Sequence, residues 1–196
     1  MSDRLDGERA DGRSLSLDDV PVAASLRAHA FVLDEVYYRA AMPAYADEQS
    51  LLNGRGGLRF PGRWHRRGIR TVYTSESPES ALSEALARGR LNRLPDERLL
   101  PLVICAVRFR LRLVVRLTDV LSATTAAFAF DAADQAVTRA IGTRCFAAGV
   151  EAMIVPSRRV DGAENLVVFP ANLKRGSLGE VADTTRDSLS PRRIDS

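Results

Sequence analysis

The sequence is poor in the residue types that build metal sites and disulfide frameworks. Its 196 residues include two cysteines and two histidines, which leaves no plausible ligand set for zinc. Cys105 and Cys145 each lie inside an apolar run, so we expect buried thiols in preference to a disulfide or a metal site. We therefore expect no metal cofactor.

Long hydrophobic runs are also missing. No stretch approaches the roughly 18 consecutive apolar residues that a membrane helix requires. Residues 1–14 are mainly charged or polar, where a signal peptide would be apolar. Together these features predict a protein without a membrane segment that works in the cytoplasm, where it is made.

Neither sign of charge is in large excess. The 28 basic and 25 acidic side chains give a formal net charge of +3, which is small for a protein that binds nucleic acid through a basic surface. All of the basic residues except Lys174 are arginines, a pattern more typical of genome composition than of a dedicated patch. Single arginines still matter, because a guanidinium group can bind phosphate in a bidentate way.

The hydrophobic content and the length together predict one domain. A hydrophobic fraction of 45% is enough for one buried core, and the chain is too short for two ordinary domains. Residues 1–22 and 174–196 are polar and show no hydrophobic period, so we predict a tail at each end of a domain at 23–173.

Hydrophobic patterns within that domain predict both strands and helices. Ser77 and Pro78 are typical of a helix start. Residues 131–148 carry apolar side chains at helical spacing, with Gly149 as a stop. The glycine-rich segment at 52–68 has the composition of a long functional loop. The other expected elements are a helix at 77–89, strands at 36–40, 71–75, 150–157 and 165–170, and either two strands or one long bent strand at 102–117. They predict an α+β fold, with a β-strand core flanked by helices.

Three consecutive segments supply residues that could share one cleft. Arg63 belongs to the glycine-rich loop, Tyr73 to the short strand after it, and Glu84 to the following helix. Cleavage of NAD⁺ at the nicotinamide–ribose bond requires side chains of these kinds. A guanidinium suits the diphosphate, an aromatic surface suits the nicotinamide, and a carboxylate can stabilise the oxocarbenium ion that forms at the ribose.

Each of these residues also has an ordinary structural interpretation. Arg63 lies among several other arginines of its loop and could simply be solvated. Tyr73 could be a core residue of its strand. Glu84 lies off the apolar stripe of its helix, as a solvent-facing glutamate does. Composition and spacing alone leave these alternatives open.

The segment GGLRFPGRWHRRGIRTVYTSESPESALSEAL resembles the signature of the RES-domain family. A Gly-Arg-Trp motif, a Tyr-x-Ser strand and an Ala-Leu-x-Glu helix follow one another as in that family. Further along, GVEAMIVPSRR and ENLVVFP resemble its closing motifs, a Val-Pro-Ser and an Asn that begins the last strand. The match runs in order from about Tyr37 to about Leu173, and four ordered motifs are far more specific than one.

This resemblance implies an ADP-ribosyltransferase-like fold and roles for five residues. Arg63 would bind the phosphate or ribose of NAD⁺, Tyr73 would hold the nicotinamide, and Glu84 would be the catalytic carboxylate. Arg39 would add a second cation, and Ser157 would donate to a phosphate or orient its neighbours. Without the resemblance, Arg39 would be a surface residue at a strand end and Ser157 a turn serine.

One position departs from the family pattern. The residue after Trp64 is usually Asn in the family, and here it is His65. His65 could replace a hydrogen bond of that Asn, be merely structural, or titrate near neutrality and make activity depend on pH. We interpret Trp64 as a packing anchor for the loop.

Members of the family are typically toxins of bacterial toxin–antitoxin pairs. The resemblance therefore implies a toxin that degrades NAD⁺ as its substrate and is inhibited by a helix-turn-helix antitoxin of the Xre type, and it leaves a homodimer open. A second hypothesis keeps the fold and makes the protein a mono-ADP-ribosyltransferase. A third, from a different class, is a non-enzymatic module that binds nucleic acid through the arginine-rich loop.

Overall fold

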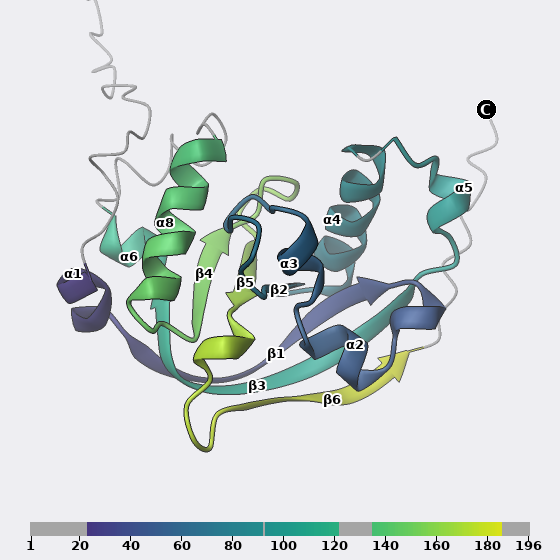
Figure 1. Ribbon diagram of the computed structural model, residues 1–196. Coiled ribbons are helices and arrows are strands. Elements are labelled where there is room, and N and C mark those ends of the chain that lie inside the picture. The colour runs from purple at the N-terminus through teal and green to yellow at the C-terminus, as the bar shows by residue number, and fades with distance from the viewer. Residues whose placement is uncertain (1–22, 92, 122–134, 186–196) are drawn as a thin grey trace, which may run out of the picture.

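The framework of the molecule is a six-stranded mixed sheet (Figure 1), seen in a computed structural model that describes residues 23–91, 93–121 and 135–185. The order is β1-β2-β5-β4-β3-β6, and β1 also pairs with β3. This extra pairing joins the first five strands in a ring, with β6 outside it along β3. The strands are β1 (Phe31–Ala41), β2 (Val72–Ser75), β3 (Val103–Arg116), β4 (Ala152–Pro156), β5 (Glu164–Val168) and β6 (Leu178–Thr185).

Two long helices lie on one side of this framework. In Figure 1, α4 and α8 stand on the same side of the sheet, with the glycine-rich segment and its short helix α3 between them. The helices are α1 (Ala23–Ala28), α2 (Glu48–Leu52), α3 (Gly56–Arg59), α4 (Pro78–Leu91), α5 (Asp96–Leu99), α6 (Leu117–Val120) and α8 (Gln135–Ala147), with 3-10 turns η2 (Pro43–Tyr45) and η3 (Pro170–Asn172). Within the described ranges, no helix is long and apolar enough to cross a membrane. The predicted α+β fold is confirmed.

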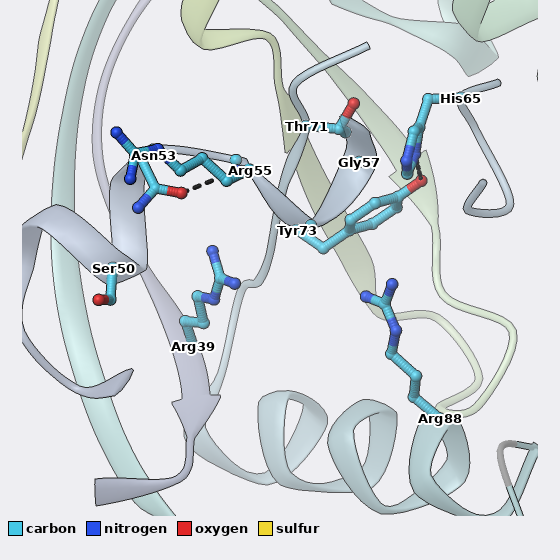
Figure 2. A pocket seen from close by; sticks show the side chains of 11 residues that line it. Arg39, Ser50, Asn53, Arg55, Gly57, His65, Thr71, Tyr73 and Arg88 are labelled. Carbon is cyan, nitrogen blue, oxygen red and sulfur yellow. Dashed lines mark hydrogen bonds between the residues drawn. The ribbon is translucent and has the colours of Figure 1, made fainter. Parts of the chain in front are cut away.

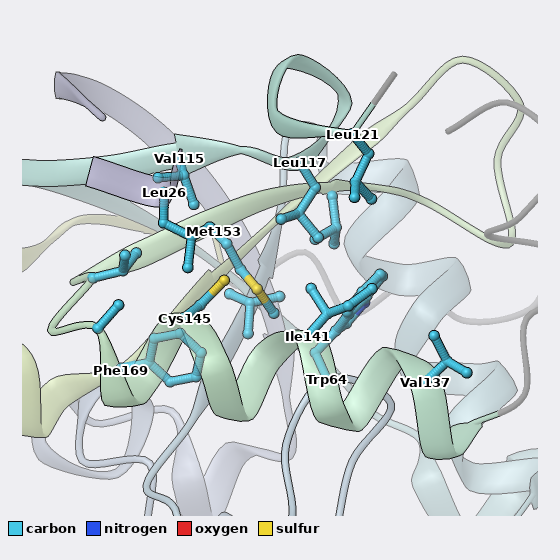
Figure 3. Close-up of a cluster of buried hydrophobic side chains, with 14 residues drawn as sticks. Leu26, Trp64, Val115, Leu117, Leu121, Val137, Ile141, Cys145, Met153 and Phe169 are labelled. Atoms are coloured by element: carbon cyan, nitrogen blue, oxygen red, sulfur yellow. The ribbon is translucent and has the colours of Figure 1, made fainter. Parts of the chain in front are cut away.

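Side chains of the inner strands alternate between two hydrophobic clusters. Ala152 and Ile154 of β4 belong to one cluster, and Met153 and Val155 to the other, as the two-residue period of a strand requires. The second cluster lies under α8 and includes Trp64 (Figure 3), so the interpretation of this residue as a packing anchor is confirmed. It also contains the predicted apolar face of the helix: Val137, Ile141, Cys145 and Ala148.

Several expected local features are present. Ser77 caps α4, because its Oγ accepts a hydrogen bond from the amide of Ser80 at 3.1 Å. Gly149 follows α8 with a φ of +78°, a conformation that glycine adopts at low cost. Cys105 and Cys145 are both free and buried.

Other expectations are corrected. Helix α4 does not end at Gly89 but continues to Leu91, and the glycine is needed because a Cβ there would overlap Leu99. The segment at 52–68 is not wholly irregular, since it contains α3. For the 102–117 region, the structure confirms the second of the two alternatives, because it forms one long strand, β3.

The largest correction concerns the C-terminal end. Leu178–Thr185 forms β6 and pairs with β3, so the expected tail at 174–196 is wrong for these residues. Strand β6 is mostly polar, and its position is set by backbone pairing with β3. This explains why the sequence shows no hydrophobic period there. The predicted N-terminal tail at 1–22 lies outside the described residues.

Candidate active site

The hydroxyl group of Tyr73 is held from two sides. It accepts a hydrogen bond from the amide of Trp64 at 3.1 Å and lies 2.8 Å from Nδ1 of His65. Nε2 of the same histidine lies 3.2 Å from the carbonyl oxygen of Phe60, which can only accept. The proton therefore sits on Nε2, and Nδ1 accepts from Tyr73. These bonds fix the Tyr73 ring against the glycine-rich loop.

His65 is a support of this loop and not a surface group. It is 1% exposed, and burial lowers its pKa from the usual 6.5, with the charges of Arg88 and Arg139 acting in the same direction. The neutral form of His65 is therefore favoured at pH 7, and the ring serves as a hydrogen-bonding support of the loop. Burial also raises the pKa of Tyr73 to about 12, so its hydroxyl keeps its proton.

Tyr73 and Arg39 line the same pocket (Figure 2). Three arginines surround this pocket, and no carboxylate is among its lining residues. The lining comprises Arg39, Ser50, Asn53, Gly54, Arg55, Gly56, Gly57, His65, Thr71, Tyr73 and Arg88. A pocket with several guanidinium groups and no acidic side chain has the charge to take an anion.

Arg39 projects from β1 and is tied down by the main chain. Its Nη1 donates to the carbonyl oxygen of Leu51. Burial, with a smaller contribution from the nearby charge of Arg88, lowers the pKa of Arg39 to about 10. It remains a cation at neutral pH.

Glu84 lies at the centre of a hydrogen-bonded chain. Its Oε1 accepts from Oγ of Ser157 at 2.9 Å and from Nδ2 of Asn165 at 3.0 Å. Oδ1 of Asn165 in turn accepts from Oγ of Ser75 at 2.7 Å. Both bonds to Glu84 use one oxygen, so among the described residues Oε2 is the oxygen left for a substrate. The solvent-facing interpretation of Glu84 is wrong.

Ser157 serves two structural purposes. While it donates to Glu84, its Oγ accepts from the amides of Arg159 and Val160 at 3.1 and 3.3 Å. It is therefore a turn serine as well as a partner of the carboxylate, and the two interpretations hold together.

The pocket and the Glu84 carboxylate are connected through β2 and α4, since both elements contribute residues to each. Tyr73 and Ser75 lie two residues apart on one face of β2, and Arg88 and Glu84 lie one turn apart on α4, about 6 Å along its axis. The Arg88 guanidinium lies 5.8 Å from the Tyr73 ring centre, while Asn165 links Ser75 to Glu84. The arginine-lined pocket and the Glu84 carboxylate therefore lie about one helical turn apart along α4.

Arg63 does not line this pocket. Its guanidinium lies 5.6 Å from the Trp64 ring centre, and its carbonyl oxygen accepts from Oγ1 of Thr138 at 2.7 Å. Its charge still reaches Tyr73, where it acts to lower the pKa of the hydroxyl. Of the five predicted site residues, Arg39 and Tyr73 share the pocket and Glu84 and Ser157 share the hydrogen-bonded chain.

Sequence analysis missed three contributors to the site. One is Asn165, which it noted only as the start of the last strand and which donates to Glu84. Arg88 follows Glu84 by one helical turn, a spacing that could have identified it. Ser75 lies two residues after Tyr73, on the same face of β2. Within the described part of the chain, no group of three or more His, Cys, Asp or Glu side chains is placed to hold a metal ion.

Comparison with known proteins places these residues in a family context. The RES domain family matches residues 36–188. Toxin Res of Pseudomonas putida is 51% identical over 43 residues, which cover 22% of this chain and 27% of that protein's length.

A solved structure has a similar fold. The toxin–antitoxin complex MbcT-MbcA of M. tuberculosis matches with a TM-score of 0.65 at 19% sequence identity, over 87% of this chain and 93% of that chain. The similarity supports the fold class expected from the sequence. Because the family match covers well over half of the residues, this chain belongs to the RES domain family.

Proposed function

We propose that this protein is the toxin of a toxin–antitoxin pair and that it cleaves the nicotinamide–ribose bond of NAD⁺. The observation that carries the proposal is the Glu84 carboxylate, held by Ser157 and Asn165 about one helical turn along α4 from a pocket lined by arginines. A relative is named Toxin Res, and the structural neighbour is a toxin bound to its antitoxin.

Glu84 is the proposed catalytic carboxylate. When the bond between C1′ of the ribose and the nicotinamide nitrogen breaks, the bonding pair leaves with nicotinamide, which becomes neutral. Positive charge then develops on the ribose, and a fixed carboxylate stabilises it. Water adds at C1′ and releases a proton to solvent, which gives ADP-ribose. Ser157 and Asn165 keep the carboxylate in place through Oε1.

The other site residues bind and orient the substrate. Tyr73 offers a ring face for nicotinamide, and its position is fixed through its hydroxyl group. Arg39 supplies a cation for the diphosphate. Arg63, which lies outside the pocket lining, is assigned to the ribose. Ser157 lies beside Glu84, where it also orients the carboxylate toward the ribose.

Purified protein mixed with NAD⁺ alone tests this proposal. We expect nicotinamide and ADP-ribose to accumulate over many turnovers with no other protein present. Release of nicotinamide only after addition of an acceptor protein, with label transferred from NAD⁺ to that acceptor, would establish a mono-ADP-ribosyltransferase instead. If NAD⁺ stays intact under both conditions while DNA or RNA binds with a steep salt dependence, the nucleic-acid module is the correct reading.

Expression in cells tests the toxin assignment. Induction of this chain alone should lower cellular NAD⁺ before growth stops. Co-expression of a helix-turn-helix partner of the Xre type should restore the NAD⁺ level and growth. Growth arrest with unchanged NAD⁺ would contradict NAD⁺ degradation as the cause. Size measurement of the purified protein decides whether it is also a homodimer.

A further inference from the structure

We propose that Arg88 and Arg39 form a subsite for the diphosphate of the substrate, and that Arg88 leaves the face of Tyr73 to admit the nicotinamide ring. The inference rests on the proposed function, because NAD⁺ supplies both the diphosphate and the ring. In this proposal Arg88 binds the substrate, and its contact with the Tyr73 ring covers the nicotinamide site until substrate arrives.

The charges in the pocket favour an anion that bridges two arginines. Arg39 and Arg88 both line it, and no carboxylate is among the lining residues. Their mutual repulsion contributes to lowering the pKa of Arg39, after the larger effect of burial. Like charges in a partly buried pocket destabilise one another. A diphosphate between the two guanidinium groups would offset that repulsion.

Only one of the two arginines is placed to move. Arg39 is partly buried and tied to the carbonyl oxygen of Leu51. Arg88 is exposed, and its guanidinium rests 5.8 Å from the centre of the Tyr73 ring. The ring itself is held at its hydroxyl group by Trp64 and His65. Arg88 is therefore the side chain that can exchange one partner for another.

Arg88 and the nicotinamide of NAD⁺ compete for the same kind of contact. The nicotinamide ring of NAD⁺ carries a positive charge, and an aromatic face attracts either cation through its quadrupole. A diphosphate that draws Arg88 toward Arg39 would uncover Tyr73 for the ring. After cleavage nicotinamide is neutral, so the returning guanidinium would help to displace it.

The position of Glu84 favours a diphosphate that belongs to a larger substrate over a free phosphate ion. Glu84 and Arg88 lie on successive turns of α4, about 6 Å apart along the axis. A molecule that places an anion near Arg88 and a ribose near Glu84 must extend along the helix, as a dinucleotide can.

Calorimetric titration of the full chain with two small probes tests the proposal. Inorganic pyrophosphate represents the diphosphate, and the 1-methylnicotinamide cation represents the charged ring. Arg88→Ala should bind pyrophosphate about tenfold more weakly, as expected for loss of a charge-assisted contact. The same variant should bind 1-methylnicotinamide about threefold more tightly, because the competing guanidinium is gone.

Arg67→Ala is the matched control. Arg67 is exposed and lies outside the pocket lining, so its loss removes the same charge without removing a pocket group. We expect the affinity of this variant for either probe to change by about twofold or less, since salt screens distant charges. Equal weakening of pyrophosphate binding in both variants would overturn the subsite. So would the absence of pyrophosphate binding to the parent protein.

Two further outcomes are decisive. If Arg88→Ala binds 1-methylnicotinamide no more tightly than the parent, the exchange at Tyr73 is wrong. If inorganic phosphate binds as tightly as ADP-ribose, the subsite serves a free ion and not a diphosphate. Neither small probe contains a nicotinamide–ribose bond, so failure of these tests is distinguishable from failure to consume NAD⁺.

Discussion

At the scale of single residues, Glu84 accepts both of its hydrogen bonds from described residues through one oxygen, Oε1. Glu84→Gln keeps the volume and an oxygen that can still accept from Ser157 and Asn165. It removes the charge that stabilises the transition state in the proposed reaction. We expect kcat for NAD⁺ cleavage to fall on the order of 10²–10³, with little change in NAD⁺ affinity, because the charge acts in the chemical step.

Glu79→Gln is the control for this substitution. Glu79 lies in the first turn of the same helix and is exposed, so its variant should keep the parent kcat. The free energies of unfolding of both variants, measured by thermal melting, should lie within about 1 kcal/mol of the parent value. A folded Glu84→Gln protein that cleaves NAD⁺ at the parent rate would falsify the catalytic assignment.

His65 predicts a dependence of stability on pH. Because burial lowers its pKa in the folded protein, the unfolded chain binds the proton more readily. Its contribution to the free energy of unfolding is therefore present above about pH 6.5 and is lost as the pH falls below that value. Protonation of Nδ1 would also remove the acceptor for the Tyr73 hydroxyl.

His65→Asn isolates this contribution. An asparagine has a carbonyl oxygen that could accept from Tyr73, and it does not titrate. We expect its melting temperature to fall less than that of the parent between about pH 7 and pH 5. If the melting temperatures of the two proteins fall in parallel as the pH decreases, His65 does not contribute to the pH dependence of stability.

At the scale of elements, α8 holds the loop that carries Arg63. Arg139 donates from Nε to the carbonyl oxygen of Gly62 at 2.9 Å, and Thr138 donates to that of Arg63 at 2.7 Å. The helix backbone comes so close at Gly142 that a Cβ there would overlap the Trp64 carbonyl group. The loop conformation thus depends on a helix some 75 residues later in the chain.

Gly142→Ala should separate these two elements. Since the added methyl group meets backbone, which cannot rotate away, we expect the free energy of unfolding to fall by about 1–3 kcal/mol and KM for NAD⁺ to rise. Gly56→Ala is the control for stability, because its Cβ would meet nothing within 4 Å. The prediction fails if Gly142→Ala melts like the parent protein.

Strand β6 carries a second prediction at this scale. Val181 packs against the hydrophobic cluster that contains Phe109, and β6 pairs with β3 from Leu178 to Thr185. A chain that ends after Gly176 loses several backbone hydrogen bonds, each of about 1 kcal/mol. It should therefore melt well below a chain that ends after Thr185. Equal melting temperatures would mean that β6 adds no stability.

These elements also show what could be predicted from the sequence. Helix α8 was predictable because its buried side chains repeat at helical spacing. Strand β6 was not, because pairing with β3 places it and its own residues are mainly polar. Glu84, Tyr73 and Ser157 were identified through their motifs. Arg88 was missed because its one-turn spacing from Glu84 is a weak signal among many arginines, and its contact with Tyr73 is visible only in the fold.

At the scale of the whole molecule, three arginines line the pocket, and two of them, Arg55 and Arg88, are exposed. An inhibitory partner that covers the cleft should therefore present carboxylates to it. We expect its binding to slow hydrogen exchange at the amides of 54–57 and to weaken as salt increases. A fully inhibited complex with unchanged exchange in that segment would indicate inhibition from elsewhere.

The hydrogen-bonded chain around Glu84 joins residues that lie far apart in the sequence. Glu84 comes from α4, whereas Ser157 and Asn165 arrive 73 and 81 residues later, and β6 follows them. A growing chain on the ribosome thus has no complete site until Asn165 has been added. No product that stops before Asn165 contains all three groups, so a stop codon at any position before Asn165 should abolish the proposed toxicity.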